Sequence, residues 1–284
     1  MKTPLHTLAA WLCTLAAALA CGTAQAAVPQ TQIDWLTDFY NSTQGPGWTN
    51  HANWLSGDPC DNNWHNVTCN AGKTTVTGLH LNTHNLQGTL PGNWASGLPD
   101  LEQADLRDNH LSGSLPNLSG HPTLNAVFVG DNAFTGPLPP MTNLPELQFF
   151  YADHNQLTGS IPDLSGLPKL WFFSVSSNKL NGTISPVLPS TLLAFRVEGN
   201  ALTGPAPNLP APNNLVLGNS ALCPNHLSPA PSPGWDTATA VAPWYDSCTP
   251  PPGAAAIPTL GEWALALLAL LVGTAAFFLK IKSL

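Results

Sequence analysis

Carboxylate and imidazole side chains recur through the middle of the chain, and these groups could support acid–base catalysis or cation binding. The residues concerned are Asp105, Asp108, Asp131, Asp153 and His154. Two carboxylates are sufficient for glycoside hydrolysis, and carboxylate oxygens are ligands for Ca²⁺. A polysaccharide-acting enzyme and a Ca²⁺ site between Asp108 and Asp131 are therefore two alternatives to weigh against the rest of the sequence.

No sequence motif places these acids in a catalytic centre. The chain contains no G-x-S-x-G, H-E-x-x-H, P-loop or G-x-G-x-x-G motif. Nothing in the sequence indicates the deep cleft that a glycosidase needs. We therefore predict no catalytic residue, no cofactor and no bound metal, with the polysaccharide-acting enzyme kept as the alternative.

The acids lie within residues 101–207, a stretch that repeats one phrase five times. Asn109, Asn132, Asn155, Asn178 and Asn200 recur at intervals of 23, 23, 23 and 22 residues, and a glycine follows each asparagine four residues later. A fixed period of this length indicates stacked coils. We expect the apolar first, fourth, sixth and eleventh places of each unit to face the interior. The ninth-place asparagine should then bond the backbone of adjacent coils, because an unsatisfied buried amide is costly.

Each unit reads L-x-x-L-x-L-x-x-N-x-L-x-G-x-L/I-P with substitutions, and this phrase resembles the plant-type leucine-rich repeat. The resemblance implies an α/β solenoid, a right-handed superhelix of about six to seven coils with capped ends. It also implies that the third, fifth, seventh and eighth places of each coil face a concave sheet. Residues 76–222 are assigned to these repeats.

On the concave face, aromatic residues of the third to fifth coils should form one patch beside an acidic border. The aromatic residues are Phe128, Phe149, Tyr151, Trp171 and Phe172, and the border consists of Asp105, Asp108, Asp131, Asp153 and His154. Exposed aromatic side chains in a contiguous patch typically mark a binding surface. In the alternative interpretation, Phe149 and Phe172 tuck partly into the sheet and the acids are simply solvated.

Residues 27–75 and 223–248 are expected to close the two ends of the repeats. The first segment holds apolar residues at helical spacing, followed by a W…PC…W…VTC phrase that resembles the cap of plant-type leucine-rich repeat proteins. Four cysteines remain after residues 1–26 are set aside, and an even number in an exported chain favours disulfides. We expect the local pairs Cys60–Cys69 and Cys223–Cys248.

The beginning of the chain reads as a secretory signal peptide over residues 1–26. Lys2 precedes an apolar run, and Ala24-Gln25-Ala26 has the small residues of a cleavage site. A lipoprotein signal ending at Cys21 is a minor alternative.

The end of the chain, residues 257–284, follows a Pro- and Ala-rich linker at 249–256 and carries a second signal. An apolar run at 263–279 is long enough for a short transmembrane helix, and Lys280 and Lys282 follow it. The motif before the run resembles the IPTL-type sorting signal of Gram-negative bacteria, through Ile257, Pro258, Thr259, Leu260 and Trp263. The resemblance implies processing by an exosortase-type transpeptidase. A plain single-pass anchor in the membrane is the alternative.

The charge balance excludes nucleic acid as a partner. Residues 27–256 hold 15 of the 16 acidic residues but only 5 of the 8 basic ones, so no basic stripe exists to meet phosphates. We predict an exported or cell-surface recognition module, not an enzyme, that binds a protein or a glycan on its concave face. A structural envelope or matrix protein is the third possibility.

Overall fold

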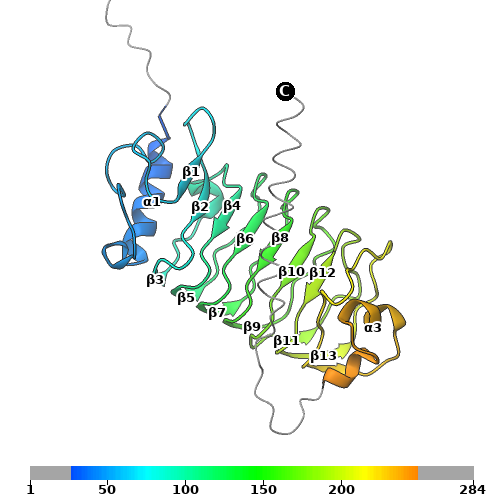
Figure 1. Cartoon of the computed structure of the whole chain (residues 1–284). Coiled ribbons are helices and arrows are strands. Elements are labelled where there is room, and N and C mark those ends of the chain that lie inside the picture. Colours follow the sequence, from blue (N-terminus) through cyan, green and yellow to red (C-terminus); the bar gives the residue numbers. More distant parts are fainter. Residues whose placement is uncertain (1–26, 249–284) are drawn as a thin grey trace, which may run out of the picture. The chain divides into compact units, whose positions relative to one another are not determined.

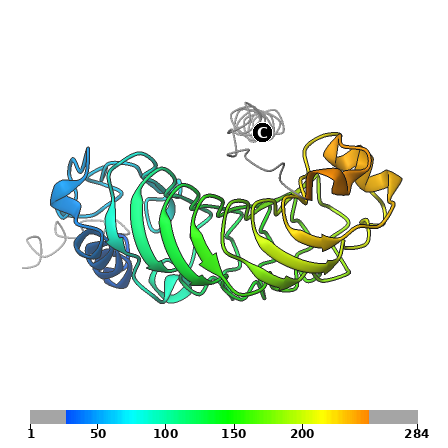
Figure 2. The ribbon, with the colours of Figure 1, turned by 90° about the horizontal axis from the view of Figure 1, so that it is seen from below.

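The computed structural model describes residues 27–248, which form one curved solenoid (Figures 1 and 2). The predicted signal peptide, linker, transmembrane helix and sorting motif lie outside these residues. Within residues 27–248, no helix has the length and apolar character needed to cross a membrane.

A seven-stranded sheet lines the concave side of the solenoid and consists of one short strand per coil, preceded by one strand of the cap. Neighbouring strands are parallel and in register, except that β1 pairs with β2 antiparallel. The strands, in sheet order, are β1 (Val67–Cys69), β2 (Val76–His80), β4 (Gln103–Asp105), β6 (Ala126–Phe128), β8 (Phe149–Tyr151), β10 (Phe172–Ser174) and β12 (Ala194–Arg196).

The opposite part of each coil forms a second set of short strands (Figure 1). These make a four-stranded and a three-stranded parallel sheet. The first contains β3 (Gln87–Thr89), β5 (His110–Ser114), β7 (Ala133–Pro137) and β9 (Gln156–Thr158), and the second contains β11 (Asn181–Thr183), β13 (Ala201–Pro205) and β14 (His226–Ser228).

The predicted α/β class needs a correction, because the described chain is a β-solenoid of about seven turns. Its helices lie towards the two ends: α1 (Gln30–Ser42), η1 (Gly45–Gly47), α2 (Trp94–Gly97), α3 (Pro233–Thr239) and η2 (Trp244–Cys248). The physical reason lies in the repeat itself. A coil of 22 or 23 residues already contains two strands and the turn at the ninth-place asparagine, which leaves few residues for a helix. The proline near the end of the second strand also opposes helix formation in those remaining residues.

The interior is built from the four apolar places that the repeat predicts. First-place Leu147, fourth-place Phe150 and eleventh-place Leu157 each have no exposed surface, and their equivalents in the other central coils are also buried. The rings of Phe150 and Phe173 stack with centroids 5.6 Å apart, and those of Phe173 and Phe195 follow at 5.8 Å. The predicted inward-facing places are therefore confirmed.

The ninth-place asparagines form a hydrogen-bonded ladder between coils. Asn155 Oδ1 accepts from the Phe134 amide of the preceding coil at 2.9 Å, and Asn155 Nδ2 donates to the Val129 carbonyl of that coil at 3.0 Å. The same pattern continues to Asn225, which bonds Leu202 and Val197 at 2.9 and 2.8 Å. The ladder thus extends into residues that the sequence analysis assigned to the C-terminal cap.

Aromatic side chains and one disulfide cover each end of the solenoid. At the N-terminal end Trp48, Trp54 and Trp64 are buried beside α1, while Trp235 and Trp244 are buried at the other end. The predicted pairs Cys60–Cys69 and Cys223–Cys248 are both present. A repeat exposes apolar surface at its open ends, and these caps remove that surface from water.

Candidate recognition surface

The central strand β8 partly exposes its first and last residues on the concave face and buries the middle one. In β8, Phe149 and Tyr151 are half-buried, whereas Phe150 between them has no exposed surface. This alternation is the two-residue period of a strand. The parallel register then stacks equivalent side chains of successive coils along one face.

The five predicted aromatic residues form one contiguous cluster, which we call the aromatic patch: Phe128, Phe149, Tyr151, Trp171 and Phe172. Phe149 is at its centre, stacked on Phe172 with centroids 5.5 Å apart and in edge contact with Trp171 at 5.9 Å. Phe128 contacts Tyr151 at 5.3 Å and Phe149 at 6.3 Å. Phe172 is 7% exposed, so it supports the patch from below rather than forming its surface.

Arg107 covers one edge of the patch, and the sequence analysis did not select it. Its guanidinium carbon lies 4.8 Å from the centroid of the Phe128 ring, within the range of a cation–π contact. Arg107 Nη2 also donates to Asp105 Oδ2 at 2.8 Å, and this hydrogen bond raises the pKa of Arg107. Asp105 is therefore held by a neighbouring residue of its own coil.

Three residues of the predicted acidic border converge on one point beside the patch. His154 Nδ1 lies 3.1 Å from Asp153 Oδ2 and 3.8 Å from Asp131 Oδ1. One ligand atom from each residue lies within 4.8 Å of the other two, and in residues 27–248 this is the group whose spacing suits a metal ion. Asp108, which the Ca²⁺ alternative paired with Asp131, does not belong to it.

The backbone at the eighth place of each coil adopts a left-handed turn. An acidic residue there can therefore serve the turn and need not indicate a ligand site. Asp108, Asp131 and His154 have φ angles of 56°, 52° and 50°, in the left-handed region. Asn, Asp and His are the non-glycine residues found there most often, so the acids at this place are suited to the turn as well as to a ligand.

Two charged residues of the sixth coil complete the face. Arg196 Nη2 donates to Glu198 Oε1 at 2.8 Å, and Arg196 Nε donates to the same oxygen at 3.1 Å. Burial raises the pKa of the Glu198 carboxyl, while Arg196 opposes that rise. Glu198 was not predicted as a site residue. It occupies the seventh place of its coil, as Asp153 does, and that place was expected on the concave face.

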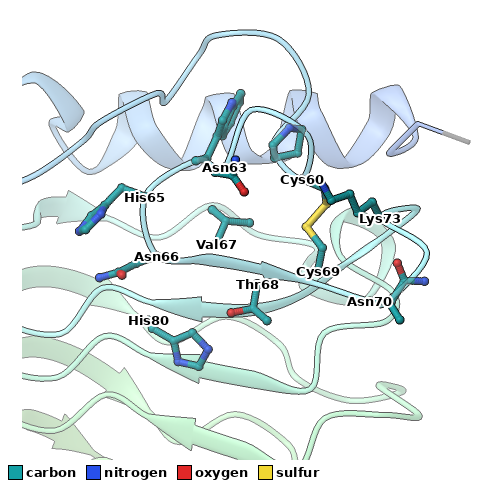
Figure 3. A pocket seen from close by; sticks show the side chains of 13 residues that line it. Cys60, Asn63, His65, Asn66, Val67, Thr68, Cys69, Asn70, Lys73 and His80 are labelled. Carbon is teal, nitrogen blue, oxygen red and sulfur yellow. A yellow bond between two sulfur atoms is a disulfide. The ribbon is translucent and has the colours of Figure 1, made fainter. Parts of the chain in front are cut away.

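A hollow of about 640 Å³ lies elsewhere, over the N-terminal cap (Figure 3). The Cys60–Cys69 disulfide lines it, together with Thr68, Lys73 and His80. It is distant in sequence from the aromatic patch, and none of its lining residues was predicted to bind a ligand. Because Lys73 pairs with Asp61 at 3.3 Å, the cation that lines this hollow is already matched by a carboxylate.

Comparison with known proteins supports both resemblances. Residues 255–279 match the IPTL-CTERM motif. A probable leucine-rich repeat receptor-like serine/threonine-protein kinase of Arabidopsis thaliana is 33% identical over 108 residues, which are 32% of this chain and 10% of the relative. The chain thus spans about a tenth of the length of this relative.

Solved structures of plant receptors share the fold. A pollen receptor kinase 3 structure matches with a TM-score of 0.53 and 28% identity, over 70% of this chain and 97% of that one. The ectodomain of the Arabidopsis thaliana receptor kinase SOBIR1 matches with a TM-score of 0.51 and 23% identity, over 64% of this chain and 99% of that one. Over its described solenoid the chain is therefore similar in sequence and fold to plant-type leucine-rich repeat proteins, and it carries an IPTL-CTERM motif at residues 255–279.

Proposed function

We propose that the chain is an exported recognition module that binds a peptide or protein along its concave face, with the aromatic patch as the main contact. The observation that carries this proposal is the contact of Phe128, Phe149, Tyr151 and Trp171 across adjacent coils while each remains partly exposed. Aromatic anchors of this kind supply most of the binding energy in many interfaces.

The scaffold suits recognition because it holds the patch on hydrogen-bonded strands. The main chains of β6, β8 and β10 pair in register, so the rings lose little freedom when a ligand binds. Neighbouring carboxylates would favour a ligand that is neutral or basic. The similar receptor ectodomains are consistent with a role in recognition, and the absence of an enzymatic activity stays a prediction.

The location that fits this function is outside the cell. Two disulfides favour an oxidising compartment, and the IPTL-CTERM motif favours sorting to the surface by an exosortase-type enzyme. In the same proposal, the predicted helix at 263–279 either anchors the chain in the membrane or is removed during sorting. A glycan is the second candidate ligand, because the patch includes the partly exposed Trp171 and the carboxylates of the acidic border can accept hydrogen bonds from hydroxyls.

The test is a selection of displayed 12-residue peptides on the immobilised full-length chain, with a glycan array probed in parallel. We expect peptides whose affinity falls at least about tenfold in Phe149→Ala and in Tyr151→Ala, the loss typical of an interface anchor. Thr158→Ala, an exposed change on β9 of the opposite sheet, is the matched control and should bind normally. Peptide binding that is unchanged in both patch variants, or an array signal for glycans alone, would contradict the proposal.

A further inference from the structure

A recess interrupts the row of large side chains on the concave sheet at β10. In the fifth place, Ser174 lies in register between Tyr151 of β8 and Arg196 of β12. In the seventh place, Ser176 lies between Asp153 and Glu198 of the flanking coils. Strands are about 4.8 Å apart, so the flanking positions are separated by about 10 Å, with only two serines between them.

One buried acceptor beside this recess lacks a hydrogen-bond partner. Oε2 of Glu198 is buried and has no hydrogen-bond partner within residues 27–248, whereas Nε and Nη2 of Arg196 both donate to Oε1. Ser174 and Ser176 are 4% and 3% exposed, and their hydroxyls make no side-chain hydrogen bond in the same part of the chain. Since buried polar atoms are nearly always paired in native proteins, the unpaired Oε2 of Glu198 needs an explanation.

The charges around the recess favour a cation. Asp153 and Glu198 flank it from opposite sides, and the negative charge of Asp153 contributes to the raised pKa of Glu198. Glu198 balances the charge of Arg196, and Asp153, whose Oδ2 lies 3.1 Å from Nδ1 of His154, adds a second carboxylate beside the recess. Tyr151 closes one wall, and burial raises the pKa of its hydroxyl well above the ordinary value, which keeps that group neutral.

We propose that this recess binds a primary ammonium group, the side chain of a lysine in the peptide or protein that lies on the aromatic patch. The inference rests on the proposed function and adds the chemistry of the ligand. An ammonium is a compact charge with three donors, and the unpaired Glu198 oxygen and the serine hydroxyls are three acceptors. A guanidinium fits less well, because Arg196 already occupies Oε1 and a bidentate contact needs both oxygens.

The position of the recess agrees with this assignment. Both Tyr151 and Phe172 border it, and both also belong to the aromatic patch. Glu198 remains 17% exposed as a side chain, so a rotation of its carboxylate presents one oxygen to an incoming donor while Arg196 keeps the other. A lysine stem can therefore pack over the aromatic rings while its ammonium enters the recess.

The first test uses peptides selected on the full-length chain, each compared with a copy in which lysine is replaced by norleucine. We expect a loss of about ten- to a hundredfold in affinity on that replacement, the range for one hydrogen bond to a charged group. Glu198→Gln should weaken the lysine peptide by a similar factor and leave the norleucine peptide unchanged. Glu146→Gln, which removes an exposed acid paired with Lys169, is the matched control and should change neither.

The outcomes separate this inference from the proposed function. If Phe149→Ala weakens binding while lysine replacement and Glu198→Gln do not, the ammonium site is wrong and the recognition surface stands. If no peptide binding depends on the patch, both are wrong.

A second measurement uses n-butylammonium chloride as a probe that needs no peptide. We expect it to shift the backbone amide resonances of Ser174 and Ser176 in the full-length chain, with 1-butanol producing no such shift. The shift should disappear in Glu198→Gln. Equal shifts with butanol, or no shift at all, would overturn the proposal even if the variant proved unstable.

Discussion

At the scale of single residues, Glu198 is an acid of the concave face whose environment favours the neutral form. Burial is the main cause of its raised pKa, and the nearby Asp153 adds to it, while Arg196 acts in the opposite direction. An ionised carboxylate in this environment destabilises the folded protein when no ligand is bound. Residues of this kind are common where a fold is built to accept a ligand.

This environment predicts an unusual dependence of stability on pH. A raised native pKa means that the native state holds the proton of Glu198 more tightly than the unfolded chain does. Its stabilising contribution is therefore complete below the unfolded pKa of about 4.3 and is lost as pH rises through the native pKa. In urea unfolding, the stability of Glu198→Gln relative to the wild type should increase between pH 4 and pH 7. A relative stability that falls with pH would show that the Arg196 pair dominates instead.

At the scale of the element, the coil is held by its asparagine more than by its short strands. Each strand of the concave sheet has three to five residues, too few to be stable alone. The amide of Asn155 serves two coils, and the residue is only 8% exposed, so water cannot readily replace its hydrogen bonds. The ladder thus gives each coil a fixed register on the previous one, which aligns the aromatic patch.

Removing one amide from the ladder should destabilise the solenoid as a whole. Asn155→Ala leaves the Phe134 amide and the Val129 carbonyl unpaired, and we expect a loss of about 2–3 kcal/mol in the free energy of unfolding. Gln156→Ala, at the adjacent exposed position, is the control and should change stability by less than about 0.5 kcal/mol. Equal, small effects in the two variants would mean that the ladder adds no net stability.

The period of the repeat predicted the ladder and the interior, because Leu and Asn recur at places that one geometry satisfies. The period did not distinguish an α/β solenoid from a β-solenoid. That difference depends on how many residues of each coil remain after the second strand, and whether they can form a helix. The aromatic patch could also be predicted, since alternation along β8 places Phe149 and Tyr151 on one face. The recess could not, because it depends on which oxygen of Glu198 Arg196 occupies, and the sequence does not contain that information.

At the scale of the whole molecule, the described solenoid supplies a surface, and we expect the sequence on either side of it to determine where that surface is displayed. The IPTL-CTERM match at residues 255–279 is separate from the repeats, and nothing in the binding argument depends on it. We therefore expect the cellular location of the chain and its ligand binding to be independent of each other. A variant can lose one of them and keep the other.

This independence predicts the composition of the mature protein. If the C-terminal motif is a processing signal, mass spectrometry of the chain from the cell surface should show an end upstream of the apolar run that begins at Trp263. Replacing Pro258 and Thr259 with alanine should leave the chain uncut, with Leu284 present, while peptide binding on the concave face stays unchanged. A wild-type chain that ends at Leu284 would instead identify the segment as an anchor. Loss of peptide binding in the uncut variant would contradict the independence of the two parts, because residues 27–248 contain every side chain of the proposed surface.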